Sequence, residues 1–200
     1  MTKIKMCGMM NPFDVISVKE MNVEYAGFIL SSGFRRSLSY RAFSDLEKLL
    51  EGSTVKRVGV FVNEEIEFID KYYDKNIDVY QLHGNEDNKY IDNLRKCIKK
   101  PIIKAFKIKD IHDVIDANRS TADMILLDSG EGSGEMFDHS LLNGIQRDFF
   151  LAGGLNPENI SDVLKKISPY AVDVSSGIET NGKKDITKME AFVNVVRRKV

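Results

Sequence analysis

The stretch of residues 149–179 reads FFLAGGLNPENISDVLKKISPYAVDVSSGIE, and it decides the fold that we predict for the chain. Two short apolar runs, at 149–152 and 171–174, have the length and residue types of buried strands. The run between them is amphipathic, and we expect its helix to open with Asn156 as N-cap and Pro157 at the first position. The stretch therefore predicts one strand–helix–strand unit of a parallel sheet.

Each of these two strands runs into small residues, Gly153-Gly154 in one case and Ser175-Ser176-Gly177 in the other. Because no large side chain blocks the way, backbone N–H groups at such turns can approach an anion closely. Two turns of this kind, one strand–helix unit apart, are what a phosphate site on the last two strands of a barrel requires. Tight turns without a ligand use the same residues, but the pair of turns favours a phosphate site.

The same alternation of apolar and amphipathic runs recurs eight times along the chain. We expect strands at residues 3–6, 25–30, 55–62, 79–82, 102–106, 124–127, 149–152 and 171–174. Besides the helix at Asn156, we expect helices near residues 11–19, 39–50, 64–73, 85–99, 110–118 and 185–200, and a short one capped by Asp138. Short buried strands that alternate with helices predict a parallel sheet of the α/β class.

Eight such units suggest closure into a (β/α)8 TIM barrel that forms a single domain over residues 1–200. The alternative is a doubly wound open sheet, whose first turn favours the pattern Gly-x-Gly-x-x-Gly. The first turn of this chain reads CGMMN at residues 7–11, which does not have that pattern. We therefore predict the barrel, with its phosphate site at strands seven and eight.

Composition narrows the class of partner. Charged residues make up 30% of the 200 residues and the net charge is −1, so no basic field indicates binding to nucleic acid or to an anionic membrane. No apolar run is long enough to span a bilayer, and the N-terminus lacks the apolar core of a signal peptide. Cys7 and Cys97 lie far apart and form no metal spacing. We expect a cytoplasmic protein with a small phosphorylated ligand and no metal, either a monomer or a homodimer.

Two residues at predicted strand ends can exchange protons. Cys7 follows the first strand, and a cysteine thiol ionises close enough to neutral pH to act as a general base. A small buried side chain without a reaction is the other interpretation of a lone cysteine. Asp128 ends the sixth strand, where an apolar setting favours a protonated carboxyl that can act as a general acid. A loop aspartate that accepts backbone N–H bonds is the alternative.

Three further features lie near the same strand ends. Arg36 follows the second strand and could bind a planar carboxylate through two hydrogen bonds, although the adjacent Arg35 leaves the choice between them open. His83 follows the fourth strand, where a functional role and local packing are both consistent with its position. The glycine-rich segment 130–134 is compatible with a lid or with a plain loop. Together these residues indicate proton transfer on a phosphorylated small molecule.

Motifs from one end of the chain to the other point to a known family. They are KIKMCG (3–8), RVGVFVN (57–63), QLHG (81–84), LLD (126–128), GSG (132–134), FD (137–138), GGLNPEN (153–159), VDVSSGIE (172–179) and GKKD (182–185). In this order they resemble the motifs of phosphoribosylanthranilate isomerases. That family carries out an Amadori rearrangement in tryptophan biosynthesis, an aldose–ketose isomerisation that needs no cofactor.

The resemblance implies a role for each candidate. Asp128 would protonate the furanose ring oxygen as general acid, and Cys7 would remove the C2 proton of the resulting Schiff base. Arg36 would bind the anthranilate carboxylate. The turns at Gly153-Gly154 and Ser175-Ser176-Gly177 would hold the phosphate, and Asp173 would face the ligand near its hydroxyls.

The chain departs from the family pattern at three loop positions, Ser37, Ser133 and His139, where an aromatic residue, a glycine and a tryptophan are usual. None of them touches the expected acid, base or phosphate turns, so we expect altered loop packing and retained activity. Two alternatives stay open. One is a different sugar-phosphate enzyme built on a barrel, and the other is a barrel that binds a phosphorylated metabolite without turning it over.

Overall fold

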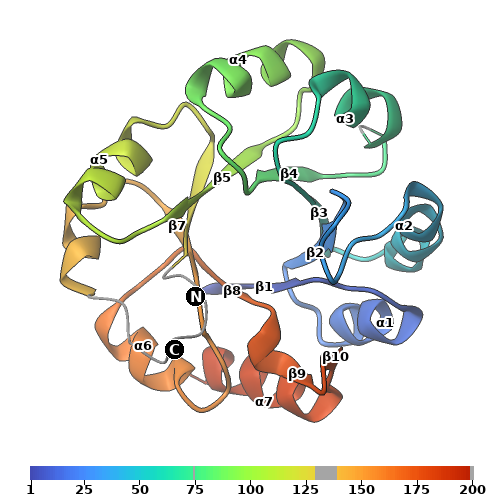
Figure 1. The fold of residues 1–200 in the computed structure, drawn as a ribbon. Coiled ribbons are helices and arrows are strands. Elements are labelled where there is room, and N and C mark those ends of the chain that lie inside the picture. The colour runs from blue at the N-terminus through green and yellow to red at the C-terminus, as the bar shows by residue number, and fades with distance from the viewer. Residues whose placement is uncertain (74, 129–138, 199–200) are drawn as a thin grey trace.

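Eight parallel strands close into a barrel, and helices surround it on the outside (Figure 1). The structure is a computed structural model that describes residues 1–73, 75–128 and 139–198. The strands pair in chain order, and β8 closes the barrel on β1. Their bounds are β1 Lys3–Cys7, β2 Tyr25–Ile29, β3 Lys56–Phe61, β4 Val79–Leu82, β5 Ile102–Lys107, β6 Met124–Asp128, β7 Phe149–Ala152 and β8 Ala171–Val174. The predicted (β/α)8 barrel is confirmed.

Most of the α-helices begin directly after a residue whose side chain caps them. The α-helices are α1 Pro12–Glu20, α2 Tyr40–Glu47, α3 Ile66–Tyr73, α4 Asn88–Cys97, α5 Ile111–Arg119, α6 Ile160–Lys166 and α7 Ile186–Arg197, and the short 3-10 helices are η1 Lys48–Leu50, η2 His139–Gly144 and η3 Ser176–Ile178. Side chains of Asn11, Ser39, Asp110 and Asp185 accept hydrogen bonds from the first turns of α1, α2, α5 and α7. The expected cap Asp138 lies outside the described residues. No helix in the described ranges is long and apolar enough to cross a membrane.

Helix α6 begins one turn later than the sequence predicts. The Oδ1 atom of Asn156 accepts hydrogen bonds from the backbone N–H groups of Glu158 and Asn159, at 3.0 and 2.9 Å, and Asn159 Oδ1 accepts one from Asn156 N at 2.9 Å. These bonds close a separate turn around Pro157, and the first helical residue is Ile160. The prediction that Asn156 caps this helix is therefore wrong. The remaining predicted helices of the described ranges have ends within about one turn of the expected ones.

The barrel interior has an apolar end and a polar end. Alternation along each strand places every second residue inside. Towards the N-terminal strand ends these residues form an apolar plug, in which the rings of Tyr25 and Phe150 meet edge to face with centroids 5.3 Å apart. Nearer the C-terminal strand ends, the interior holds the buried polar residues Lys5, Gln81 and Asp173. The C-terminal ends of the strands are therefore the polar end of the barrel.

A short hairpin follows β8, which the sequence analysis does not predict. Strands β9 (Glu179–Thr180) and β10 (Lys183–Lys184) pair antiparallel, with Lys184 opposite Glu179. The hairpin places a carboxylate and an ammonium group beside the C-terminal end of β8. It thereby adds charged groups to the polar end of the barrel.

Candidate active site

Cys7 is the last residue of β1, and its side chain is held in a space left by glycine. Its Cα partner on β2 is Gly27, and an added Cβ at Gly27 would lie 2.7 Å from Cys7 Sγ. The backbone turns directly after Cys7, because Gly8 has a φ of 78° and the N–H groups of Gly8 and Met9 both donate to Gly27 O. The hydroxyl of Ser175 donates to Cys7 O at 3.0 Å. The predicted general base is thus fixed between β2 and the turn after β8.

A buried ion pair lies next to Cys7 inside the barrel. Lys5 stands two residues before Cys7 on β1, so both side chains are on the inner face, and its Nζ atom donates to both oxygens of Asp173 at 2.9 Å. The Lys5 side chain is fully buried and that of Asp173 is 8% exposed. Burial alone would lower the pKa of Lys5, but attraction to Asp173 and to Cys7 outweighs it and raises that pKa above its ordinary value.

This ion pair gives Asp173 a contact that the sequence analysis does not predict. The residue lies in the expected place, one position before the end of β8, but both of its oxygens bind Lys5. Its contribution in this structure is to fix a cation beside the Cys7 sulfur. Sequence reasoning missed Lys5, although a lysine at the inward position next to Cys7 was a usable signal.

Asp128 ends β6, and the His83 side chain lies beside it. The His83 Nε2 atom lies 3.6 Å from Asp128 Oδ2, and Gln81 Nε2 lies 3.5 Å from His83 Nδ1. If the Gln81 amide donates, Nδ1 accepts and the neutral ring carries its proton on Nε2, facing Asp128. The Asp128 and His83 side chains are 21% and 33% exposed, so both are open to a ligand. The glycine-rich segment 130–134, which could form a lid, lies outside the described residues.

Arg36 lies directly over the turn that follows Cys7. Its Cδ atom is 2.5 Å from the position that a Cβ on Gly8 would take, and Ser175 Oγ is 3.3 Å from the same point. Its Nε and Nη2 atoms donate to the two oxygens of Glu179, at 2.7 and 2.9 Å. The Arg36 side chain is only 16% exposed. The structure therefore brings Arg36, Cys7 and Ser175 together.

Arg35 occupies the outer side of the same carboxylate. Its Nη2 atom donates to Glu179 Oε2 at 2.7 Å, and its Nη1 atom donates to the carbonyl of Gly182 at 2.9 Å. Its side chain is 55% exposed. Of the two adjacent arginines, Arg36 is thus the one next to Cys7.

The two predicted glycine-rich turns lie side by side. A Cβ on Gly177 would collide with the carbonyl of Leu155, so the turn after β8 packs directly on the turn after β7. Gly153 and Gly154 have φ values of 98° and 59°, a conformation that favours glycine, and a Cβ on Gly154 would meet open space. The short helix η3 begins at Ser176. In barrels, two such loops and the start of a short extra helix commonly form a phosphate site.

Charged groups from the hairpin complete this side of the site. Lys184 Nζ donates to Ser175 O at 2.9 Å and to Glu179 Oε1 at 3.0 Å, and its side chain is 3% exposed. Burial lowers the pKa of Lys184, against the attraction of Glu179 and Cys7. Sequence reasoning assigned no role to Glu179 or Lys184, because their position depends on a hairpin of two-residue strands.

The charge balance of this cluster suits an anionic ligand. Lys5, Arg35, Arg36 and Lys184 carry positive charge, and Asp173 and Glu179 carry the negative charge that the cluster contains. Positive charge is thus in excess around the turn at Ser175. Within the described parts of the chain, no three His, Cys, Asp or Glu side chains gather in a way that could hold a metal ion.

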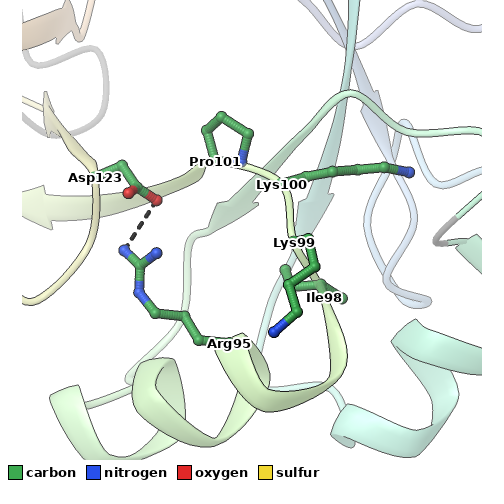
Figure 2. A pocket seen from close by; sticks show the side chains of 6 residues that line it. All are labelled: Arg95, Ile98, Lys99, Lys100, Pro101 and Asp123. Atoms are coloured by element: carbon green, nitrogen blue, oxygen red, sulfur yellow. Dashed lines mark ion pairs between the residues drawn. The ribbon is translucent and has the colours of Figure 1, made fainter.

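A separate hollow of about 370 Å³ lies at the other end of the barrel (Figure 2). Its lining includes Ile98–Pro101, which precede β5, and Asp123, which precedes β6. Figure 2 shows the ion pair of Arg95 with Asp123, whose atoms are 2.9 Å apart. Because barrel enzymes carry their active sites at the C-terminal strand ends, we do not assign this hollow a part in the reaction.

Comparison with known proteins agrees with this site. Residues 4–195 match the family model described as N-(5'-phosphoribosyl)anthranilate (PRA) isomerase. The N-(5'-phosphoribosyl)anthranilate isomerase of Endomicrobium trichonymphae is 42% identical over 203 residues, which cover 98% of this chain and 99% of that protein.

Two crystal structures have the same fold. Monomers generated from the dimeric phosphoribosylanthranilate isomerase of Thermotoga maritima superpose with a TM-score of 0.86 at 32% identity, covering 99% of this chain and 100% of theirs. A phosphoribosylanthranilate isomerase in complex with reduced 1-(o-carboxyphenylamino)-1-deoxyribulose 5-phosphate gives the same TM-score, identity and coverage. With its barrel, its motifs and these relatives in agreement, the chain belongs to the phosphoribosylanthranilate isomerase family.

Proposed function

We propose that this barrel, as one domain of residues 1–200, converts N-(5-phosphoribosyl)anthranilate into 1-(2-carboxyphenylamino)-1-deoxyribulose 5-phosphate. The reaction is an Amadori rearrangement, the third step of tryptophan synthesis from chorismate, and it needs acid–base catalysis without a cofactor. The observation that carries the proposal is Cys7, with its neighbouring cation Lys5, at the same barrel end as Asp128 and the paired glycine-rich turns. The bound product analogue of the related crystal structure supports the same substrate class.

The proposed reaction divides the proton transfers between two residues. Asp128 gives a proton to the furanose ring oxygen, the bond from that oxygen to C1 breaks, and the nitrogen lone pair forms the C1=N bond of a Schiff base. Cys7, as thiolate, then takes the proton from C2. The electron pair of that C–H bond forms the C1=C2 double bond of an enolamine, and the π pair of the C1=N bond returns to nitrogen. Protonation of C1 and loss of the hydroxyl proton give the ketone at C2. A positioned acid and base of this kind each contribute roughly a hundredfold to ten-thousandfold in rate.

Two ends of the substrate are anionic, and we assign each to a subsite. The phosphate binds at Gly153, Gly154, Ser175, Ser176 and Gly177, where backbone N–H groups and the start of η3 can surround an anion.

The anthranilate carboxylate binds Arg36. Its low exposure and its position over Gly8 support Arg36 over Arg35 for this role. Asp173 belongs to the ribose end of the site, and the two hydrogen bonds that it accepts from Lys5 support an action through that lysine.

The assay follows the loss of anthranilate fluorescence, with the substrate made in situ and the protein produced in a host that lacks its own isomerase. We expect turnover by the wild type and none above background from Cys7→Ala/Asp128→Asn prepared in parallel. A wild type that binds the phosphorylated product analogue and turns nothing over would instead favour the barrel that binds a metabolite without reaction.

We also propose a cytoplasmic location, because the reaction uses a phosphorylated biosynthetic intermediate, and we propose no nucleic-acid partner. The relative from Thermotoga maritima is dimeric, and a homodimer or a monomer are the two states that we propose. Light scattering of the purified protein measures the molar mass in solution; about 22.7 kDa indicates the monomer and twice that mass the homodimer.

A further inference from the structure

The guanidinium group of Arg36 has two edges, and one of them is occupied by the protein itself. The contacts of Arg36 with described residues use the Nε/Nη2 edge, which donates two hydrogen bonds to the two oxygens of Glu179. A guanidinium carries five N–H donors, and its Nη1/Nη2 edge can bind a second carboxylate in the same plane. The same arginine can thus bind Glu179 and a ligand carboxylate at once.

Glu179 is held more firmly than a surface ion pair would hold it. Its side chain is 6% exposed and accepts hydrogen bonds from Arg35 and Lys184 besides Arg36. Its backbone carbonyl accepts one more from Lys188 Nζ at 2.8 Å. Burial alone would raise the pKa of Glu179, but the hydrogen bonds from Arg36, Arg35 and Lys184 lower it to about 2. Glu179 is therefore a fixed anion at neutral pH.

The contacts of Glu179 also reach the other anion subsite. Lys184 bonds Glu179 Oε1 with the same ammonium group that bonds the carbonyl of Ser175. Ser175 in turn bonds Cys7 O through its hydroxyl. One carboxylate thereby joins the arginine over Cys7 to the turn assigned to phosphate, so its position sets the spacing between the two subsites.

We propose that Glu179 is a positioning residue, which holds Arg36 by one edge so that the other edge receives the carboxylate of the substrate. This inference rests on the proposed function, because it assigns Arg36 to that carboxylate. Glu179 itself touches no reacting atom. Its effect on the recognition of the carboxylate should therefore act through Arg36.

The test compares two non-reacting ligands that differ only in that group. One is reduced 1-(o-carboxyphenylamino)-1-deoxyribulose 5-phosphate, and the other is the same molecule without its carboxyl group. Calorimetry gives a Kd for each, and the ratio of the two measures carboxylate selectivity. We expect Glu179→Gln to reduce this ratio roughly tenfold to a hundredfold, the usual size of a hydrogen bond to a charged group.

A double-mutant cycle separates positioning from a general structural effect. In an Arg36→Met background, the addition of Glu179→Gln should change the ratio little, because the group through which Glu179 acts is gone. Glu47→Gln is the matched control. Glu47 is another buried carboxylate paired with an arginine, Arg57, at 2.7 Å, but it lies on α2 and outside the site. It should retain the wild-type ratio.

Glu179→Asp keeps the negative charge, but its side chain is too short to accept both hydrogen bonds from Arg36. This variant replaces Glu179→Gln in the test if Glu179→Gln does not fold. It too should lose selectivity. The inference is overturned if either Glu179 variant retains the wild-type ratio, or if the double variant loses much more than Arg36→Met alone.

Turnover is measured separately from binding. A wild type that binds both ligands without turning over the substrate contradicts the proposed function, while the ratio still tests Glu179. Turnover with an unchanged ratio in Glu179→Gln contradicts the Glu179 inference alone. A wild type that binds neither ligand contradicts both.

Discussion

Cys7 and Gly27 are Cα partners on β1 and β2, and the absence of a side chain at Gly27 is what leaves room for the Cys7 sulfur. A Cβ at Gly27 would lie 2.7 Å from Sγ and 3.1 Å from the Cα of Cys7, so both the side chain and the backbone would have to move. We predict that Gly27→Ala lowers kcat at least about tenfold, because small displacements of a catalytic group are costly. Steady-state kinetics on the folded variant measures this.

Gly59→Ala is the control for that change. Gly59 also lies inside a strand, β3, but a Cβ there would collide with Ile77 and Phe61 and not with Cys7. It should lower the melting temperature and leave kcat of the folded protein near the wild-type value. Equal losses of kcat in the two variants would show that strand distortion, and not the contact with Cys7, causes the effect.

Removal of Lys5 should affect both stability and rate. Lys5→Met leaves Asp173 buried without its ion-pair partner, and such a change usually costs about 3–5 kcal/mol in free energy of unfolding. Lys5→Met/Asp173→Asn removes both charges and should recover much of that loss in urea denaturation.

The kcat of the same double variant should nevertheless stay below that of the wild type, because the cation beside the Cys7 sulfur is missing. Recovery of stability with wild-type kcat would mean that Lys5 is structural only.

Acid should weaken the contribution of Glu179 to stability. The pKa of this group is about 2 in the folded protein against its ordinary 4.5. A carboxyl with a depressed folded pKa stabilises the fold fully above its unfolded pKa and loses that contribution as the pH falls through the folded one. The free energy of unfolding of wild type minus that of Glu179→Gln should therefore be largest above pH 4.5 and shrink as the pH falls towards about 2. A difference that stays constant over this range would show that Glu179 does not have a depressed pKa in the folded protein.

The local sequence pattern is sufficient to predict the strands and the positions of several site residues. Three strands have the bounds that the sequence predicts, namely Val79–Leu82, Phe149–Ala152 and Ala171–Val174. Each is a short apolar run delimited by turn residues, which define where the strand begins and ends. Barrel closure follows from the eight repeats. Strand ends then place Cys7 and Asp128 at one end of the barrel, as expected.

What could not be predicted depends on contacts between distant segments. The start of α6 was misplaced because Asn156 and Asn159 cap each other in a turn. The pairing of Glu179 with Arg36 joins residues 143 positions apart through a hairpin too short to leave a periodic pattern. Such contacts are set by closure of the barrel, which a local sequence pattern does not encode.

We propose that Cys7 and Asp128 share the proton transfers of one isomerisation, and the kcat values of Cys7→Ala and of Asp128→Asn test this division of roles. The wild type and both folded single variants are compared by fluorescence, with the Kd of the product analogue measured for each. We expect each variant to bind the analogue like the wild type and to lose roughly a hundredfold to ten-thousandfold in kcat. Near-wild-type kcat in either variant would contradict the role that we give to that residue.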